Sequence, residues 1–154
     1  MIQYQNATKL QRLCRSTALL RANEVVVPFR SEHGVKYVQV KVNGVGFDMI
    51  FDTGCSGTLI SVAEANYLYQ KGLLTEEDFR GKSQSQIADG SVVENMVVNL
   101  REVVINDQIR CPDVEATVSA SIHAPLLLGN EVLDRLATIQ IDNERQALIF
   151  RLKQ

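Results

Sequence analysis

The residues best suited to chemistry lie near the middle of the chain, where an apolar stretch ends in an acidic loop. The sequence there is Phe47-Asp48-Met49-Ile50-Phe51-Asp52-Thr53-Gly54-Cys55. A carboxylate at the end of a buried strand is costly unless it is paired, hydrogen-bonded or protonated. Thr53 brings a hydroxyl that can donate to it, and Gly54 lets a backbone N–H approach it closely. Asp52 is therefore a candidate catalytic carboxylate.

The alternative for Asp52 is a structural carboxylate that caps a turn, because Asp-x-Gly is common in loops. The apolar strand before it favours catalysis. Asp89 and Asp142 lie in predicted turns with no apolar strand before them. Neither is expected to be a second catalytic aspartate.

A single carboxylate limits the chemistry that one chain can perform. Hydrolysis of a peptide bond without a metal or covalent nucleophile needs an activated water and a proton donor. Two adjacent carboxylates that share one proton supply both, because like charges so close cannot both ionise easily. The chain has one Asp-Thr-Gly, and a two-fold dimer would place Asp52 against Asp52 of a second copy. We therefore expect a homodimer.

The elements that must position Asp52 are short strands separated by turns. Apolar and polar residues alternate over 38–42 and again over 47–51, which indicates two strands with one buried face each. Between them, Asn43-Gly44 is a strong hairpin signal because both positions tolerate positive φ. The second strand delivers Asp52 to its end.

The rest of the pattern also indicates short strands, with a few helical segments. Ser61-Val62-Ala63-Glu64 is a capping box, Gly72 is a helix stop, and Pro28 favours an edge strand. The other predicted strands are 24–30, two strands within 83–98, 100–105, 108–111, 114–118, 126–128, 138–141 and 146–152. The predicted helical segments are 62–71, 75–78 and 130–136.

Length and composition indicate one domain at 24–154, preceded by an N-terminal arm or helix at 1–23. The segment 1–23 has no acidic residue, and its apolar stretch is too short for a secretory signal. An organelle-targeting peptide is the alternative. No apolar run approaches the roughly 18 to 20 residues of a membrane span. The net charge of −2 with mixed signs does not indicate a nucleic-acid surface.

The cysteines Cys14, Cys55 and Cys111 are widely spaced and odd in number. We expect neither a disulfide framework nor a zinc site. With His33 and His123 as the two histidines, we expect no metal centre and no cofactor. Reduced thiols fit a cytoplasmic location, with the periplasm as the alternative. Cys55 is expected to be a small buried residue; the alternative is a redox-sensitive thiol beside the site.

Together these motifs resemble those of retropepsin-like aspartic proteases, the single-domain retroviral type. Three features follow the family's order between about residues 25 and 152. They are the hairpin that leads into the Asp-Thr-Gly loop, a second hairpin around Ile87-Ala88-Asp89-Gly90-Ser91, and Leu126-Leu127-Leu128-Gly129 before a short helix. The resemblance implies a mainly β fold: a closed barrel with one or two short helices, equivalent to half of a pepsin-like enzyme.

The resemblance also implies roles for particular residues. Asp52 would be the catalytic carboxylate, Thr53 would hydrogen-bond across the dimer axis, and Gly54 would offer its backbone N–H. The residues of the flap that covers the substrate would be Ala88, Asp89 and Gly90.

The last helix begins with Asn130-Glu131 rather than the retroviral Arg-Asn/Asp pair, and Asp89 puts a charge on the flap tip. The pattern therefore resembles bacterial members more than viral ones. The implied function is an aspartic endopeptidase that acts on peptide or protein substrates. The alternative is a catalytically silent module for dimerisation or peptide binding, since fold does not guarantee activity. A pepsin-like half domain of a larger assembly fits the length less well.

Overall fold

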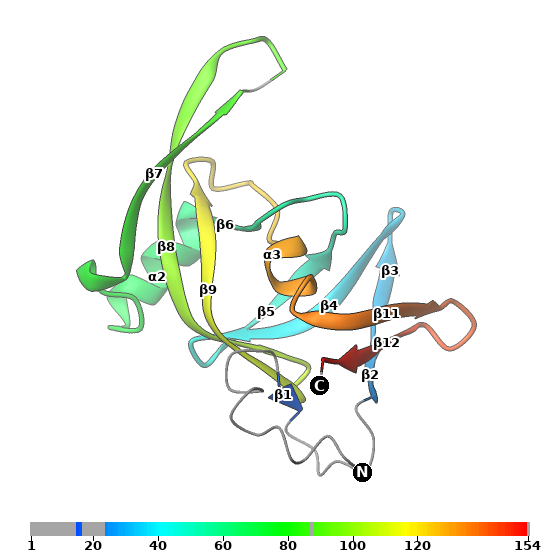
Figure 1. Ribbon diagram of the computed structural model, residues 1–154. Coiled ribbons are helices and arrows are strands. Elements are labelled where there is room, and N and C mark those ends of the chain that lie inside the picture. Colours follow the sequence, from blue (N-terminus) through cyan, green and yellow to red (C-terminus); the bar gives the residue numbers. More distant parts are fainter. Residues whose placement is uncertain (1–14, 17–23, 87, 154) are drawn as a thin grey trace.

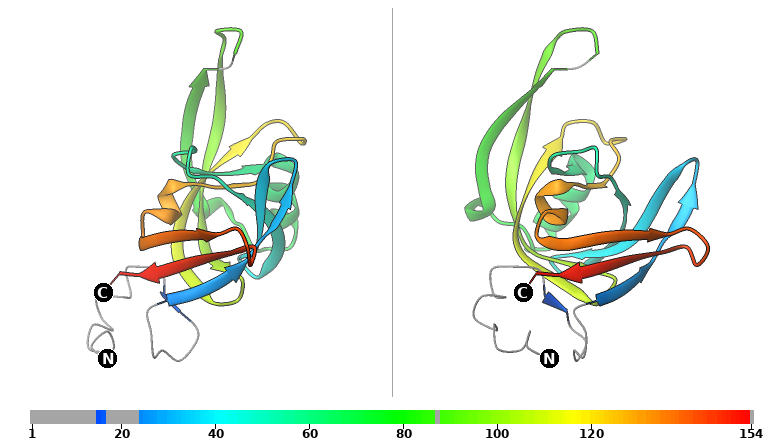
Figure 2. Two further views of the ribbon diagram at one scale, coloured as in Figure 1. Left: turned by 90° about the vertical axis from the view of Figure 1, so that its right-hand side faces the viewer. Right: turned by 45° about the vertical axis from the view of Figure 1, so that its right-hand side comes forward.

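A larger mixed sheet and a smaller antiparallel sheet make up most of the described chain in the computed structural model, which describes residues 15–16, 24–86 and 88–153 (Figure 1). In the larger sheet the strands follow the order β9-β6-β10-β5-β4-β8, and β8 pairs again with β9, so the ring closes. The smaller sheet has the order β11-β12-β2 and lies beside this barrel (Figure 2). The predicted mainly β, closed-barrel fold is confirmed.

The elements have the following bounds. The strands are β1 Arg15–Ser16, β2 Glu24–Pro28, β3 Arg30–Glu32, β4 Val35–Val42, β5 Val45–Phe51, β6 Thr58–Ser61, β7 Phe79–Gln86, β8 Val92–Ile105, β9 Ile109–Ser119, β10 Leu127–Leu128, β11 Leu136–Asp142 and β12 Ala147–Leu152. The helices are α2 Val62–Gln70, α3 Asn130–Leu133 and the 3-10 turn η2 Glu76–Asp78.

The β4–β5 hairpin follows the sequence prediction. Its turn is Asn43-Gly44, with φ of 49° and 91° respectively, and the ladder is in register from Val42↔Val45 to Tyr37↔Ile50. The Asn43 side chain also donates to Leu73 O (2.7 Å) and accepts from the N–H of Glu102 (3.0 Å). The turn is therefore tied to two other parts of the chain.

The sequence signals predicted for the start and the end of helix α2 are also confirmed. The Ser61 hydroxyl accepts from Ala63 N–H, while the Glu64 carboxylate accepts from Ser61 N–H, which completes the capping box. Gly72 follows the helix with φ of 73°, a conformation that favours glycine after a helix end. Pro28 ends β2, an edge strand of the smaller sheet, as predicted.

Other predicted boundaries are wrong. The helix predicted for 130–136 ends at Leu133, and Leu136 already begins β11. The strands predicted at 108–111 and 114–118 are one strand, β9, in which Pro112 stays in register opposite Glu102. β8 likewise joins segments that the sequence separates. In each case pairing with a neighbouring strand overrides the local turn signal.

The core fills the barrel and continues beneath the smaller sheet. Its largest fully buried side chains include Phe150, Met49, Leu68 and Leu100, and Phe51 packs against Phe150 with ring centroids 6.4 Å apart. Met49 and Phe51 belong to the strand that leads to Asp52. Burial of this strand therefore fixes where the Asp52 loop starts.

Of the predicted arm at 1–23, the structure describes β1, which pairs with β9; the rest of the predicted arm lies outside the described residues. No helix in the described part of the chain is long and apolar enough to cross a membrane. Cys111 is disulfide-bonded, so the expectation that the thiols are reduced is wrong for this residue. Cys55 is free.

Replacing Asn43 tests how much its side chain stabilises the barrel. In Asn43→Ala, Glu102 N–H and Leu73 O lose a partner, and the free energy of unfolding should fall by about 1–3 kcal/mol, measured by urea denaturation. His33→Ala is the matched control, because His33 has a similar φ of 52° in the exposed β3–β4 turn. Equal losses in the two variants would assign the effect to backbone conformation alone.

Candidate active site

Asp52 directly follows β5, and its half-buried carboxylate is held by its own loop. Gly54 N–H donates to Asp52 Oδ1 at 2.8 Å. A Cβ on residue 54 would lie 3.2 Å from the same oxygen, a tight contact, so glycine favours this approach. An N–H donor aimed at one carboxylate oxygen fixes the orientation of the carboxylate.

The backbone beside Asp52 is held by β10, which lies between β5 and β6. β10 pairs parallel with β5 at Leu128↔Phe51 and antiparallel with β6 at Leu127↔Leu59. Asp52 N–H donates to Leu128 O at 3.2 Å, which extends this ladder by one residue. The Leu126-Leu127-Leu128 segment therefore supports the start of the loop through its strand pairing with β5.

The first residues of α3 hold the far side of the loop. Asn130 N–H donates to Cys55 O (2.8 Å), and Glu131 N–H donates to Ser56 O (3.0 Å). The Asn130 side-chain amide donates to Thr53 O at 2.8 Å. Because these carbonyls belong to a loop without a strand partner, α3 supplies the hydrogen bonds that the loop would otherwise lack.

A close backbone approach makes this contact possible. At Gly129, an added Cβ would lie 2.1 Å from Gly57 O and 2.8 Å from Cys55 O. Both distances are far below any van der Waals contact, and both partners are backbone atoms. Glycine at 129 is therefore required by packing, since its φ of −103° is accessible to any residue.

The remaining loop residues are open to solvent on the outer side. Thr53 and Gly54 are exposed, while Cys55 is half-buried and its thiol lies 3.1 Å from Gly57 O. This free thiol sits within the loop beside Asp52, rather than in the apolar core. No group of three or more His, Cys, Asp or Glu side chains suited to a metal ion occurs among the described residues.

A cavity of about 290 Å³ adjoins Asp52. It is bounded by the start of β4, the end of β5 and one residue of β11. Its lining residues are Gly34, Val35, Lys36, Ile50, Phe51, Asp52, Thr53 and Ile141. One wall is therefore mostly apolar, and Lys36 adds a positive charge.

Ala88, Asp89 and Gly90 form the exposed tip of the β7–β8 hairpin, which projects away from the barrel (Figure 1). Asp89 Oδ1 accepts from Ser91 N–H (2.8 Å) and Ser91 Oγ–H (2.6 Å). The Ser91 hydroxyl, with the backbone N–H, holds the pKa of Asp89 below its ordinary value. The charge noted at the tip thus also serves to close the turn.

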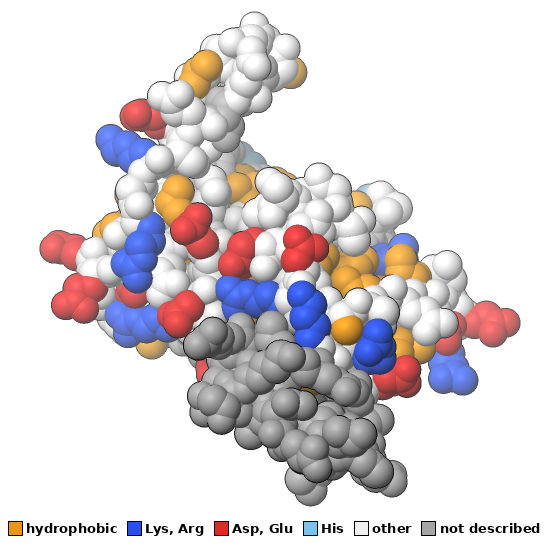
Figure 3. Space-filling view, viewed as in Figure 1, with side chains coloured by type: hydrophobic (Ala, Val, Ile, Leu, Met, Phe, Trp, Pro, Cys, Tyr) orange, Lys and Arg blue, Asp and Glu red, His pale blue; other side chains and the backbone are white. Residues whose placement is uncertain are grey.

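Within the described residues, no hydrogen bond joins the hairpin tip to the Asp52 loop. The structure therefore brings Asp52, Thr53 and Gly54 together but leaves Ala88, Asp89 and Gly90 apart from them. Viewed in Figure 3, the hairpin stands clear of the molecular body.

Sequence reasoning did not find two parts of this site. The sequence predicts Asn130 only as the start of the last helix, whereas in the structure its side-chain amide crosses to Thr53 O and the cap position is Gly129. The start of β4 and Ile141 line the cavity although they are distant from Asp52 in the chain. No sequence signal marks the start of β4 or Ile141 as part of the cavity, because only barrel closure and the packing of the smaller sheet bring these residues next to Asp52.

Comparison with known proteins gives a family and a fold. The family model described as gag-polyprotein putative aspartyl protease matches residues 38–135. A solved structure, a retropepsin-like aspartic protease from Rickettsia conorii, superimposes with a TM-score of 0.62 and 23% identity. The match covers 84% of this chain and 90% of that one. At this identity the likeness shows the fold alone. Comparison with the curated proteins finds no match.

The contact at Gly129 can be tested by adding one methyl group. Gly129→Ala should separate α3 from the Asp52 loop and lower the free energy of unfolding by about 1–3 kcal/mol or more, as measured by urea denaturation. Gly46→Ala is the control, because a Cβ there would meet nothing within 4 Å. Similar stability of the two variants would show that the loop and α3 can move apart at no cost.

Proposed function

Because this chain belongs to the family of gag-polyprotein putative aspartyl proteases, we propose that it is an aspartic endopeptidase, active as a homodimer. Each chain would contribute one Asp-Thr-Gly loop, with Asp52 as the catalytic carboxylate. The observation that carries this proposal is the held geometry of Asp52, with Gly54 N–H on one carboxylate oxygen at 2.8 Å. A turn-capping role alone would not need β10 and α3 to fix the same loop from two sides.

The proposed reaction uses two Asp52 carboxyls with one proton between them. The ionised carboxylate takes a proton from a water molecule while the water oxygen bonds to the carbonyl carbon of the substrate. The protonated carboxyl donates its proton to the carbonyl oxygen, and a tetrahedral diol results. The diol then collapses: the now ionised carboxylate takes a proton from one diol hydroxyl, the other Asp52 carboxyl protonates the amine nitrogen as the C–N bond breaks, and an amine and a carboxylic acid leave.

The outer residues support the proposed assignments. Thr53, exposed beside Asp52, would hydrogen-bond across the dimer axis and keep the two loops in register. The cavity next to Asp52, bounded by Val35, Ile50 and Ile141, would accept an apolar substrate side chain near the cleaved bond. An extended peptide would lie along the site as an added strand.

The flap assignment of Ala88, Asp89 and Gly90 also belongs to this proposal. These residues lie at an exposed hairpin tip, where main-chain groups are open to an extended peptide. The division into an arm at 1–23 and a protease domain at 24–154 stays a prediction, as does a cytoplasmic location.

Replacing Asp52 tests catalysis directly. Asp52→Asn keeps the size of the side chain but removes the base, and peptide cleavage at mildly acidic pH should fall by at least about 10²-fold. The readout is mass spectrometry of a varied peptide library, with sedimentation to follow the dimer. Asp48→Asn is the matched control, an exposed carboxylate on the same strand, and should retain full cleavage.

Mixing chains separates the shared site from its alternatives. With equal amounts of native and Asp52→Asn chains, about one quarter of randomly paired dimers carry two native loops, so activity per native chain should drop by about half. Unchanged activity per native chain would reject the shared site. A dimer that cuts no peptide in the library would instead support the silent dimerisation or peptide-binding module.

A further inference from the structure

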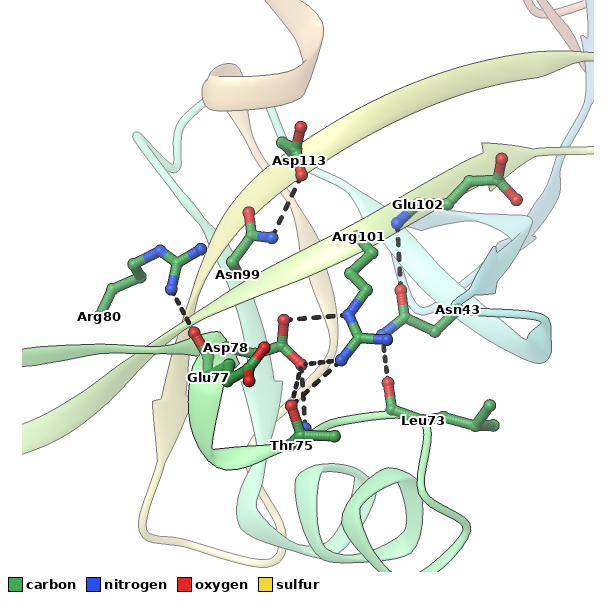
Figure 4. A network of polar contacts seen from close by, with 10 residues as sticks. All are labelled: Asn43, Leu73, Thr75, Glu77, Asp78, Arg80, Asn99, Arg101, Glu102 and Asp113. Carbon is green, nitrogen blue, oxygen red and sulfur yellow. Dashed lines mark hydrogen bonds and ion pairs between the residues drawn. The ribbon is translucent and has the colours of Figure 1, made fainter.

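A cluster of polar side chains lies at the base of the β7–β8 hairpin, away from Asp52 (Figure 4). At its centre is Asp78, a carboxylate that is 4% exposed. Arg101 of β8 donates to it twice, from Nε to Oδ1 at 3.1 Å and from Nη2 to Oδ2 at 2.8 Å. Thr75 adds its N–H at 2.9 Å and its hydroxyl at 3.3 Å, and also accepts from Arg101 Nη2 at 3.1 Å.

In the outer part of the hairpin, the described strand pairing joins β7 and β8 only. Its four residue pairs run from Ser83↔Asn95 to Gln86↔Val92. Pairing of β8 with β9 begins at Met96↔Val118. We call Ser83–Gln86 with Val92–Asn95 the outer ribbon. A two-stranded ribbon is marginally stable by itself, so its direction must be set at its base.

The base contains a bend. The ladder shifts between Phe79↔Val98 and Gly81↔Val97, which leaves Arg80 as an extra residue on β7. Gly81 has φ of 114°, a conformation that side chains rarely allow. Such bulges bend a strand and raise its twist. The ribbon therefore turns away from the barrel at a point adjoining Asp78.

The ion pair closes the base just beyond the last ladder pair. Arg101 lies three positions after Val98 on β8, and Asp78 directly precedes Phe79 on β7. A planar guanidinium that binds both carboxylate oxygens fixes orientation as well as distance. Next to it, Asn43 binds Glu102 N–H and Leu73 O, which ties the same two segments to the β4–β5 turn.

We propose that Asp78, Arg101 and Thr75 form a hinge clamp that sets the direction of the outer ribbon relative to the Asp52 loop. This inference rests on the proposed function, in which the hairpin tip covers a bound peptide. Asp78 and Arg101 are positioning residues, since neither touches the proposed reacting atoms. The clamp restricts rotation at the bulge, so less conformational freedom is lost when substrate binds.

The charge state of the clamp suits an acidic reaction. Hydrogen bonds from Arg101, with those from Thr75, hold the pKa of Asp78 below its ordinary value. A carboxyl whose folded-state pKa is lowered stabilises the fold above its unfolded pKa, about 3.9, and loses that contribution as pH falls further. The clamp thus stays ionised at the mildly acidic pH where a shared-proton dyad works.

The test compares Arg101→Met and Arg101→Lys with native protein in the full chain. Two measurements are made: hydrogen exchange of the outer ribbon, and steady-state cleavage of one library peptide. In Arg101→Met, ribbon amides should exchange at least about tenfold faster than native while barrel amides stay unchanged. The kcat/KM should fall roughly tenfold, mainly through KM. Arg101→Lys keeps the positive charge but loses the planar guanidinium that binds both carboxylate oxygens. Its ribbon exchange rate and its kcat/KM should lie between those of native protein and Arg101→Met.

Arg110→Met is the matched control. Arg110 pairs with Glu102 at 3.0 Å across β9 and β8, and its side chain is 50% exposed against 52% for Arg101. It should match native protein in both measurements. Unchanged ribbon exchange in Arg101→Met, or equal acceleration throughout the barrel, would overturn the clamp. Should native protein cut no peptide, the protease proposal fails while the exchange measurement still decides the clamp.

Discussion

The geometry around Asp52 depends on one interaction, the docking of the β10–α3 segment against the loop that follows β5. The loop turns sharply and leaves carbonyl oxygens without strand partners. Three of them, on Thr53, Cys55 and Ser56, receive donors from Asn130 and Glu131. Unpaired backbone groups in a partly buried loop are costly. By pairing these carbonyl oxygens, the contact fixes the conformation of the loop that carries the Asp52 carboxylate.

This interaction links distant parts of the chain. The bond from the Asn130 amide to Thr53 O spans 77 positions, and it forms only where Gly129 permits backbone contact with the loop. β10 must also enter between β5 and β6. The Asp52 loop is thus completed by the last third of the chain, after the hairpin that carries Asp52. In the proposed dimer, a second copy of the chain would supply the second Asp52 carboxyl that the reaction needs.

The molecule divides into a closed part and an open part. The ring of strands from β9 to β8 has no free edge between its members, and it holds Asp52 rigidly. The β7–β8 hairpin extends from this ring, and its outer residues 83–95 carry two charges, at Asp89 and Glu94. In the proposed protease, a carboxylate held by the barrel and a less supported hairpin with few charges would suit recognition of an extended peptide through its main chain. In Figure 4 the ionic contacts lie where the two parts meet.

Local patterns determined much by themselves: the turn at Asn43-Gly44, the Ser61–Glu64 capping box, and an apolar strand that ends in Asp-Thr-Gly. These depend on φ preferences, short-range hydrogen bonds and alternation, all properties of neighbouring residues. Tertiary structure alone decided the continuous β9 through Pro112, the early end of α3, and the meeting of Asn130 with Thr53 O. It also paired Asp78 with Arg101, 23 positions away. Such contacts follow from barrel closure, and no local pattern encodes which distant residues closure brings together.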